Sequence, residues 1–266
     1  MPEKDYVALA KQRITRPSQM EKKPKILVYA RNKKGKTTLT ASAGRGKILI
    51  LDPEQGTSET KKVDPDVWPI RKWEDAADAI GFLATGKHDY EWVGVDGLTR
   101  FNAMALDYTM KVREARQIDA QPGMVAQKDW GQAGKVMQTM MVNLYNLPYG
   151  VIYTAQERVM ESIASEADED SEEVPMAFVA DLPKGSRSMI YSLVDVIGRL
   201  YVVSVDKPDG TKVKERRLWI GENPMYDTGY RSDFELPDYI RRPTLPKIVQ
   251  LMQTGHIATR RSSSSS

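Results

Sequence analysis

The stretch from Lys25 to Thr40 constrains the fold of this chain more than any other part of the sequence. An apolar run at residues 26–29 is typical of a buried strand, and it leads through charged and small residues to the tetrapeptide GKTT at residues 35–38. A strand, a short loop and a helix in this order predict a phosphate-binding loop, in which backbone N–H groups surround an anion. In such a loop the lysine reaches the outer phosphates and the next hydroxyl holds magnesium.

The pattern departs from the usual phosphate loop at one position, because Ala30 stands where GxxxxGK[ST] has its first glycine. Either the backbone at Ala30 keeps a negative φ, or the loop is remodelled. A GK[ST] tripeptide alone arises by chance in about one chain in eight of this size. The rest of a nucleotide site must therefore follow in the sequence. The residues predicted to surround a bound nucleotide are Ala30, Arg31, Asn32, Lys33, Lys34, Gly35, Lys36, Thr37 and Thr38.

Three further apolar runs end in polar residues. Residues 47–52 lead to Glu54, residues 90–96 end in Asp96, and residues 150–155 are followed by Gln156. Parallel strands bring such residues to one edge of a sheet, where α/β proteins bind ligands. An apolar strand that ends in an aspartate after a phosphate loop is also the Walker B arrangement, in which the aspartate orders magnesium through water. These residues are therefore expected near the phosphate loop.

The order of apolar and helical segments predicts the fold class. Amphipathic or helix-compatible segments at residues 74–84, 98–118 and 128–147 alternate with the apolar runs. This alternation predicts an α/β fold whose mostly parallel sheet is flanked by helices. Two alternating runs around an Asp-Gly pair at residues 209–210 add a C-terminal antiparallel hairpin. We expect an N-terminal arm at residues 1–24, a core at 25–240 and a basic, Ser-rich C-terminal extension at 241–266.

The composition excludes several kinds of chemistry. The chain has no cysteine and two histidines, so it forms no disulfide, thiolate metal site or cysteine nucleophile, and a histidine-based triad has little support. No signal peptide is visible and no apolar stretch is long enough to span a bilayer. A cytoplasmic protein without a membrane partner is the expectation. The net charge is only +3, but residues 157–173 are strongly acidic, and residues 157–175 are expected to be mobile.

With these motifs the sequence resembles the RecA-like P-loop ATPases. More narrowly, it is similar to phage-encoded RecA-core nucleotide-binding proteins, some of which act as single-strand annealing recombinases. The resemblance covers about residues 24–240 and rests on the segments LVYARNKKGKT, ILILDPEQG, YEWVGVDGLTRF, VIYTAQ and DLPKGSRSMIYSLVDVIGRL. It implies a RecA-like core that binds and hydrolyses ATP with Mg²⁺. It also implies a homo-oligomer in the cytoplasm of the host cell.

The resemblance further implies a role for each candidate site residue. Glu54 would polarise the water that attacks the γ-phosphate, and Lys36 would bind the β- and γ-phosphates. Thr37 would hold the magnesium ion, with Asp96 in its outer coordination. Gln156 would sense the γ-phosphate. The three catalytic candidates are thus Glu54, Lys36 and Gln156, and the two metal candidates are Thr37 and Asp96.

Single-stranded DNA is the partner that the resemblance implies, in phage recombination or replication, with a single-strand-binding protein or an exonuclease as a further partner. The segment after Gln156 faces nucleic acid in RecA-type proteins, but here it is acidic, whereas DNA contact requires cations that neutralise phosphates. Arg231 resembles an arginine that reaches the nucleotide of a neighbouring subunit. The basic candidates for DNA contact are Lys184, Arg187, Lys212, Lys214, Arg216 and Arg217.

Two other functions are open at the level of the sequence. A nucleotide-dependent loader or scaffold with little turnover would be compatible with Ala30 and with the acidic segment. A partition-type P-loop ATPase would be compatible with Arg31, which lies five residues before Lys36, near the second loop lysine of that class, and with the segment LDPEQGTS. ATP turnover with and without single-stranded DNA discriminates between the alternatives.

Overall fold

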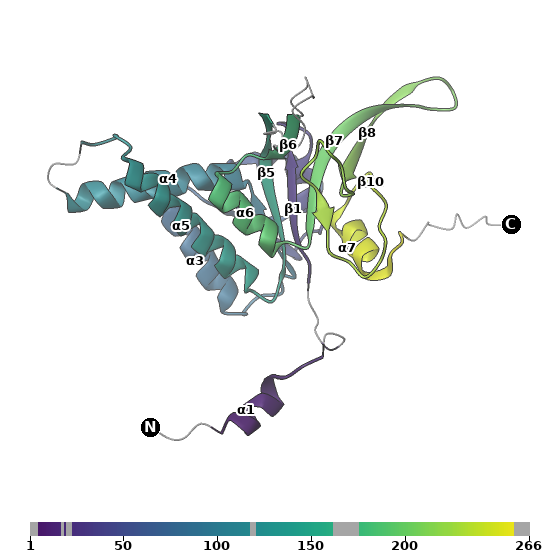
Figure 1. Ribbon diagram of the computed structural model, residues 1–266. Coiled ribbons are helices and arrows are strands. Elements are labelled where there is room, and N and C mark those ends of the chain that lie inside the picture. The colour runs from purple at the N-terminus through teal and green to yellow at the C-terminus, as the bar shows by residue number, and fades with distance from the viewer. Residues whose placement is uncertain (1–4, 17–18, 20–22, 118–120, 162–175, 258–266) are drawn as a thin grey trace, which may run out of the picture.

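A computed structural model describes residues 5–16, 19, 23–117, 121–161 and 176–257 of the chain. Within them, one ten-stranded sheet forms the centre of the molecule (Figure 1). Its strands are β1 (Lys25–Ala30), β2 (Ile48–Asp52), β3 (Asp66–Pro69), β4 (Trp92–Asp96), β5 (Gly150–Glu161), β6 (Met176–Ala180), β7 (Val196–Asp206), β8 (Lys212–Trp219), β9 (Gly229–Tyr230) and β10 (Tyr239–Arg241). Along the sheet the order is β10-β8-β7-β1-β5-β4-β2-β3, and β6 and β9 pair with β5 and β7.

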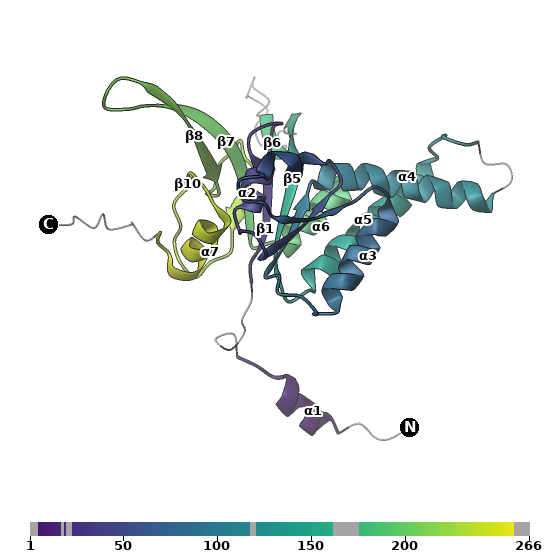
Figure 2. The same cartoon turned by 180° about the vertical axis from the view of Figure 1, so that it is seen from behind.

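The helices lie on both faces of this sheet (Figures 1 and 2). They are α1 (Tyr6–Arg13), α2 (Lys36–Ala41), α3 (Trp73–Ala84), α4 (Leu98–Arg116), α5 (Gln127–Tyr145), α6 (Lys184–Leu193) and α7 (Leu245–Thr254), and a 3-10 turn, η2, spans Gly56–Thr60. Helices α3 to α6 pack on one face, and α2 and α7 pack on the other. Helix α1 has no buried residue and lies apart from the sheet in Figure 1.

The parallel part of the sheet consists of β7, β1, β5, β4, β2 and β3. Successive residues of β1 alternate between the two cores: Leu27 and Tyr29 pack with α3 to α6, whereas Ile26 and Val28 pack on the side of α2 and α7. Since both faces of the strand are buried, its sequence is a continuous apolar run. The predicted α/β fold with a mostly parallel sheet flanked by helices is confirmed.

The predicted C-terminal antiparallel hairpin is also confirmed. Strands β7 and β8 pair from Arg199 with Trp219 to Asp206 with Lys212, and the turn contains Gly210 at φ 78°. The hairpin extends beyond the rest of the sheet (Figure 1). In the sheet, β8 and its basic side chains are separated by β7 from β1, the strand that leads to the phosphate loop.

The expectation of a mobile segment directly after Gln156 is wrong for its first residues. Strand β5 continues to Glu161 and pairs with β6 in antiparallel register, with Arg158 opposite Val179. The acidic composition suggests a loop, but backbone pairing with β6 and ion pairs of Glu157 stabilise a strand there. The remainder of the expected mobile segment, residues 162–175, lies outside the described residues.

The chain that follows residue 240 contributes to the packed core. Leu245, Ile248 and Leu251 of α7 are buried against the sheet, and the backbone N–H of Leu245 donates to Ser42 Oγ at 2.7 Å. The extension expected from residue 241 therefore begins with a helix of the core. The serine-rich end lies outside the described residues.

Glu215 is a buried carboxylate in the middle of β8, and it gives a prediction about pH. Its oxygens accept hydrogen bonds from Arg241 Nη2 at 2.9 Å and Arg217 Nε at 3.0 Å, while its side chain is 3% exposed. The Arg241 hydrogen bond is the largest cause that lowers the pKa of Glu215 from 4.5 to about 2, and the Arg217 hydrogen bond adds to it. A carboxylate with a lowered pKa stabilises the fold above its unfolded pKa, and this stabilisation is lost as the pH falls through the folded value.

We expect Glu215→Gln to lower the free energy of unfolding at pH 7 by about 1–3 kcal/mol, because buried hydrogen bonds to charged groups are lost. The difference from wild type should shrink between pH 4.5 and about 2. Urea denaturation at several pH values measures this difference in the free energy of unfolding. Glu235→Gln, at an exposed glutamate of the same size, is the matched control. Equal stability of wild type and Glu215→Gln at pH 7 would contradict the prediction.

Candidate functional site

The phosphate loop joins β1 to α2 at the carboxyl edge of the parallel strands. Gly35 is the N-cap of α2 at φ 97°, a left-handed conformation that favours glycine, and Lys36 opens the helix. Ala30 is the last, fully buried residue of β1 and does not have a positive φ. Extending the strand to Ala30 thus removes the need for a glycine there.

The ammonium group of Lys36 lies inside the loop. Its Nζ donates to the carbonyl oxygens of Ala30 at 3.0 Å and Arg31 at 3.3 Å, and to Gln156 Oε1 at 3.0 Å. Burial lowers the pKa of Lys36, while the negative charge of Asp96, followed by that of Glu54, raises it. The structure thus brings the predicted lysine and glutamine together, and strand register explains why, since Ala30 lies opposite Gln156.

Thr37 and Asp96 also meet at this edge. Thr37 Oγ1 donates to Asp96 Oδ2 at 2.5 Å, and Thr154 Oγ1 donates to Asp96 Oδ1 at 2.6 Å. Burial is the main cause that raises the pKa of Asp96, whereas the hydrogen bonds from Thr154 and Thr37 lower it. Thr154 is a site residue that sequence reasoning missed, although its place two residues before Gln156 follows from the same strand.

The donor set of Thr37 and Asp96 fits Mg²⁺, because hydroxyl and carboxylate oxygens are the hard ligands that this ion prefers. Mg²⁺ in nucleotide sites is held by one or two protein oxygens together with substrate phosphates. The part of the chain that the structure describes contains no group of three or more His, Cys, Asp or Glu side chains that could hold a metal ion.

Glu54 is held in position by hydrogen bonds to Asp52, the buried aspartate that ends β2. Asp52 Oδ1 accepts hydrogen bonds from the backbone N–H of Glu54 at 3.0 Å and of Gly56 at 3.3 Å, and its Oδ2 accepts from Thr57 N at 3.0 Å and Thr57 Oγ1 at 2.6 Å. These bonds fix the turn after the strand. Asp52 is therefore a positioning residue, a role that the sequence pattern alone did not distinguish from that of Glu54.

The carboxylate of Glu54 lies against the backbone that follows Asp96. A Cβ added to Gly97 would lie 3.1 Å from Glu54 Oε1. Desolvation is the largest cause that raises the pKa of Glu54, and the charge of Asp96 adds to it, while Lys36 and Arg100 lower it. A carboxylate with a raised pKa close to a bound phosphate is suited to accept a proton.

Glu157 makes two ion pairs that sequence reasoning missed. Its side chain is 2% exposed and accepts hydrogen bonds from Arg31 Nε at 3.0 Å and from Arg199 Nε at 2.6 Å. Sequence position alone places Arg31 in the phosphate loop, and the structure shows that its side chain is 65% exposed and is held by Glu157. The two ion pairs connect the phosphate loop to β5 and β7.

Arg216 lies directly against the phosphate loop. A Cβ at Gly35 would approach Arg216 Nε to 2.6 Å and Cζ to 2.9 Å. Beside Arg216 is a cavity of about 810 Å³ between the loop, the β7–β8 hairpin and residues 242–244. Lys34, Thr38, Leu200 and Lys214 also line it. The hairpin register, which is a long-range feature, brings Arg216 here.

The comparison with known families agrees with this geometry. A family model described as an AAA domain matches residues 22–232, which is more than half of the chain. The chain belongs to the AAA domain family. This is a family of P-loop nucleoside triphosphatases, so nucleotide binding at the loop and nucleoside triphosphatase activity in general follow from membership. A comparison with curated proteins gave no match.

The remaining sequence candidates lie elsewhere in this AAA domain. Lys184 is exposed at the start of α6, and Arg187 is half-buried one turn later. Arg231 Nη2 donates to the carbonyl oxygen of Ser192, and its backbone N–H donates to Asp195 O, at the edge of the sheet opposite the phosphate loop. The structure therefore does not bring Arg231 into the site of its own chain.

On β8, the four basic candidates have different surroundings. Lys212 and Lys214 are exposed, Arg216 lies at the phosphate loop, and Arg217 pairs with Glu215 and lies over the ring of Tyr239 at 4.7 Å. DNA contact by these residues stays a prediction. In the described part of the chain, none of the helices has the length and apolar character needed to cross a membrane.

Proposed function

We propose that this AAA domain protein is a magnesium-dependent ATPase that acts on single-stranded DNA in phage recombination or replication, where it promotes annealing as a homo-oligomer. The observation that carries the ATPase part is the convergence of five predicted residues at one edge of the sheet: Lys36, Thr37, Glu54, Asp96 and Gln156. The DNA part is supported by the resemblance of residues 24–240 to phage RecA-core proteins and by the exposed basic residues of α6 and β8.

In the proposed hydrolysis, each residue of the site has a separate role. Lys36 binds the β- and γ-phosphates and stabilises the negative charge that develops during transfer. Glu54 orients a water molecule and accepts its proton as the oxygen attacks the γ-phosphorus, and the bond to the β–γ bridging oxygen breaks to give ADP and phosphate. Magnesium, which Thr37 and Asp96 would hold, supplies neutralisation of phosphate charge when bound.

Gln156 is suited to report the γ-phosphate to the rest of the chain. In the structure its Oε1 accepts from Lys36, and its backbone N–H donates to Thr99 Oγ1 at 3.0 Å. A bound phosphate competes for Lys36, which releases the glutamine side chain to contact the γ-phosphate. The cavity beside Arg216 has the size of a nucleoside site and adjoins Thr38, so it is the place proposed for the adenosine.

One observation bears on the other functions. Arg31 is held by Glu157 on the outside of the loop, which does not favour the partition-type ATPase, in which a second loop cation acts on phosphate. A loader or scaffold with little turnover would use the same site to bind ATP without hydrolysis.

The proposal is tested by measuring ATP hydrolysis with and without single-stranded DNA, together with annealing of complementary oligonucleotides. We expect magnesium-dependent turnover that single-stranded DNA stimulates, and faster annealing when ATP is present. Tight ATP binding without turnover would indicate the loader or scaffold instead. Absence of oligonucleotide binding at low salt would refute the DNA part, because phosphate contacts are strongest there.

A further inference from the structure

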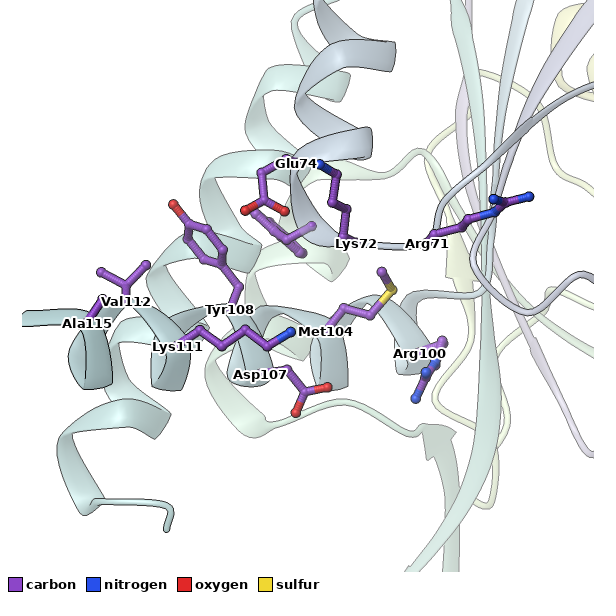
Figure 3. Close-up of a pocket in the computed structure, with 11 residues that line it drawn as sticks. Arg71, Lys72, Glu74, Arg100, Met104, Asp107, Tyr108, Lys111, Val112 and Ala115 are labelled. Carbon is purple, nitrogen blue, oxygen red and sulfur yellow. The ribbon is translucent and has the colours of Figure 1, made fainter. Parts of the chain in front are cut away.

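A second basic site lies on the same edge of the sheet, between the start of α3 and the side of α4 that runs from Arg100 to Ala115. This α3–α4 cleft has a volume of about 370 Å³ and is lined by the basic side chains Arg71, Lys72, Arg100 and Lys111 and by the rings of Trp73 and Tyr108. Figure 3 shows Arg100, Met104 and Lys111 following one another along α4. Across from them lie Lys72, just before α3, and Glu74, in its first turn. None of these residues was a candidate from the sequence.

The four basic side chains of the cleft are available to an anion. Among the residues that the structure describes, no carboxylate lies within 4.0 Å of a charged nitrogen of Arg71, Lys72, Arg100 or Lys111. The arginines of the β7–β8 region differ, since Arg199, Arg217 and Arg241 all pair with buried glutamates. Unpaired cations that converge from two elements attract phosphate groups.

The same cleft offers aromatic surface. Trp73 and Tyr108 are half-buried, and their ring centroids lie 6.4 Å apart with an interplanar angle of 31°. Partly exposed rings next to cations are the combination that binds single strands, because bases stack on the rings while the backbone follows the positive charge. A simple phosphate ion would need no such rings.

The distribution of charge along the cleft fits a nucleotide unit. Arg71 and Arg100 lie at the end nearer the sheet, and Glu74 and Tyr108 lie farther from the sheet (Figure 3). Asp107 is a second carboxylate of the lining. Carboxylate oxygens can accept hydrogen bonds from the amino groups of bases. A nucleotide with its phosphate at Arg71 and Arg100 and its base beside Glu74 would match the charges of both parts of the cleft.

Arg100 connects this cleft to the hydrolytic site. It follows Thr99, whose hydroxyl accepts a hydrogen bond from Gln156 N at 3.0 Å and donates to Asp181 O at 3.0 Å. Its positive charge is also among the groups that lower the pKa of Glu54. A ligand that binds Arg100 therefore changes the charge that Glu54 experiences and binds one residue from Thr99, which contacts Gln156.

We propose that the α3–α4 cleft binds single-stranded nucleic acid, with phosphates at Arg71, Lys72 and Arg100 and a base against Trp73 and Tyr108, and that Arg100 is the positioning residue through which the bound strand stimulates hydrolysis. This inference rests on the proposed ATPase function and names the surface through which the strand acts. A phosphate bound at Arg100 offsets the arginine charge at Glu54, so the pKa of Glu54 rises and the carboxylate becomes a stronger base.

The test replaces two cleft lysines that lie outside the hydrolytic site. In Lys72→Ala/Lys111→Ala, we expect the affinity for fluorescein-labelled oligothymidylate to fall about tenfold. The salt slope of binding should decrease by about 0.7 for each phosphate that the variant no longer neutralises. Basal ATP hydrolysis should be unchanged and its stimulation by oligothymidylate abolished. Lys87→Ala/Lys135→Ala removes the same charge at exposed positions elsewhere and should behave as wild type.

The outcomes separate this inference from the proposed function. Loss of binding in Lys212→Ala/Lys214→Ala with full binding and stimulation in the cleft variant overturns the cleft and leaves the DNA-dependent ATPase in place. No oligothymidylate binding by the wild type overturns both. If polyglutamate binds through the cleft lysines and oligothymidylate does not, the cleft is a site for an acidic peptide and the inference is wrong.

The role of Arg100 is tested by a pH profile. Removing its charge in Arg100→Gln raises the pKa of Glu54 further, so the acid limb of basal ATP hydrolysis should shift to higher pH. Oligothymidylate should no longer shift that limb in the variant, and Arg100→Lys should restore part of the response. A profile identical to that of wild type would overturn the connection to Glu54.

Discussion

ATP binding should fall by about a hundredfold in Lys36→Ala, which corresponds to roughly 3 kcal/mol of phosphate-binding free energy. The ammonium group already lies inside the loop, 3.0 Å from the Ala30 carbonyl oxygen and from Gln156 Oε1. When this ammonium group is removed, the negative charges of Glu54, Asp96 and the triphosphate are no longer offset by Lys36. Calorimetric titration with ATP and magnesium measures the change in affinity, and turnover should become undetectable.

Two controls test whether the loss of ATP binding in Lys36→Ala is specific. Lys87→Ala removes an exposed lysine outside the site and should leave ATP affinity unchanged. Thermal unfolding of Lys36→Ala checks that the protein still folds, since the lysine is bonded to the backbone of its own loop. Wild-type affinity in a folded Lys36→Ala protein would refute the assignment of the phosphate loop itself.

Turnover should fall by about a hundredfold to ten-thousandfold in Glu54→Gln, the range that a positioned general base contributes. The amide keeps the size of the side chain and cannot take the proton of the attacking water. Because Asp52 fixes the turn through backbone groups, the substitution should not disturb the turn, and ATP affinity should stay close to that of wild type. Steady-state hydrolysis combined with ATP titration separates the two effects.

The pH dependence gives a second check on Glu54. Desolvation and the charge of Asp96 raise its pKa, so wild-type turnover should fall as the pH drops through a value above the ordinary 4.5. The residual activity of Glu54→Gln should lack this limb. Glu59→Gln, at an exposed glutamate of the neighbouring 3-10 turn, should keep both rate and profile. Unchanged turnover in Glu54→Gln would mean that another group serves as the base.

The core of the candidate site could be predicted because its signals are local. A buried strand, a loop and a helix start are adjacent in sequence, so one segment identifies Lys36 and Thr37. Glu54, Asp96 and Gln156 each follow an apolar run, and the rule that parallel strands share a carboxyl edge is enough to bring them together. For Gln156, the register of β1 with β5 agrees with this rule, since Ala30 lies opposite Gln156.

The rest of the site depends on contacts between distant segments. Arg216 meets Gly35 only because β8 pairs with β7 in one register, and a shift by one residue would turn its side chain to the other face. In the sequence Glu157 is one acid among many, and only the fold pairs it with Arg31 and Arg199. The residues of the α3–α4 cleft come from helix α4, from the first turn of α3 and from the segment just before α3, and no motif in the sequence relates them.

By itself, the sequence determined the fold class, the phosphate loop and the strand-end residues, because hydrophobic runs and turn residues act over a few neighbouring positions. The tertiary structure alone decided which charges are neutralised and which are available. Glu215 and Glu157 are buried with arginines, whereas Arg100 and Lys111 have no such partner among the described residues. Ion pairing depends on distances across the fold, and composition does not contain those distances.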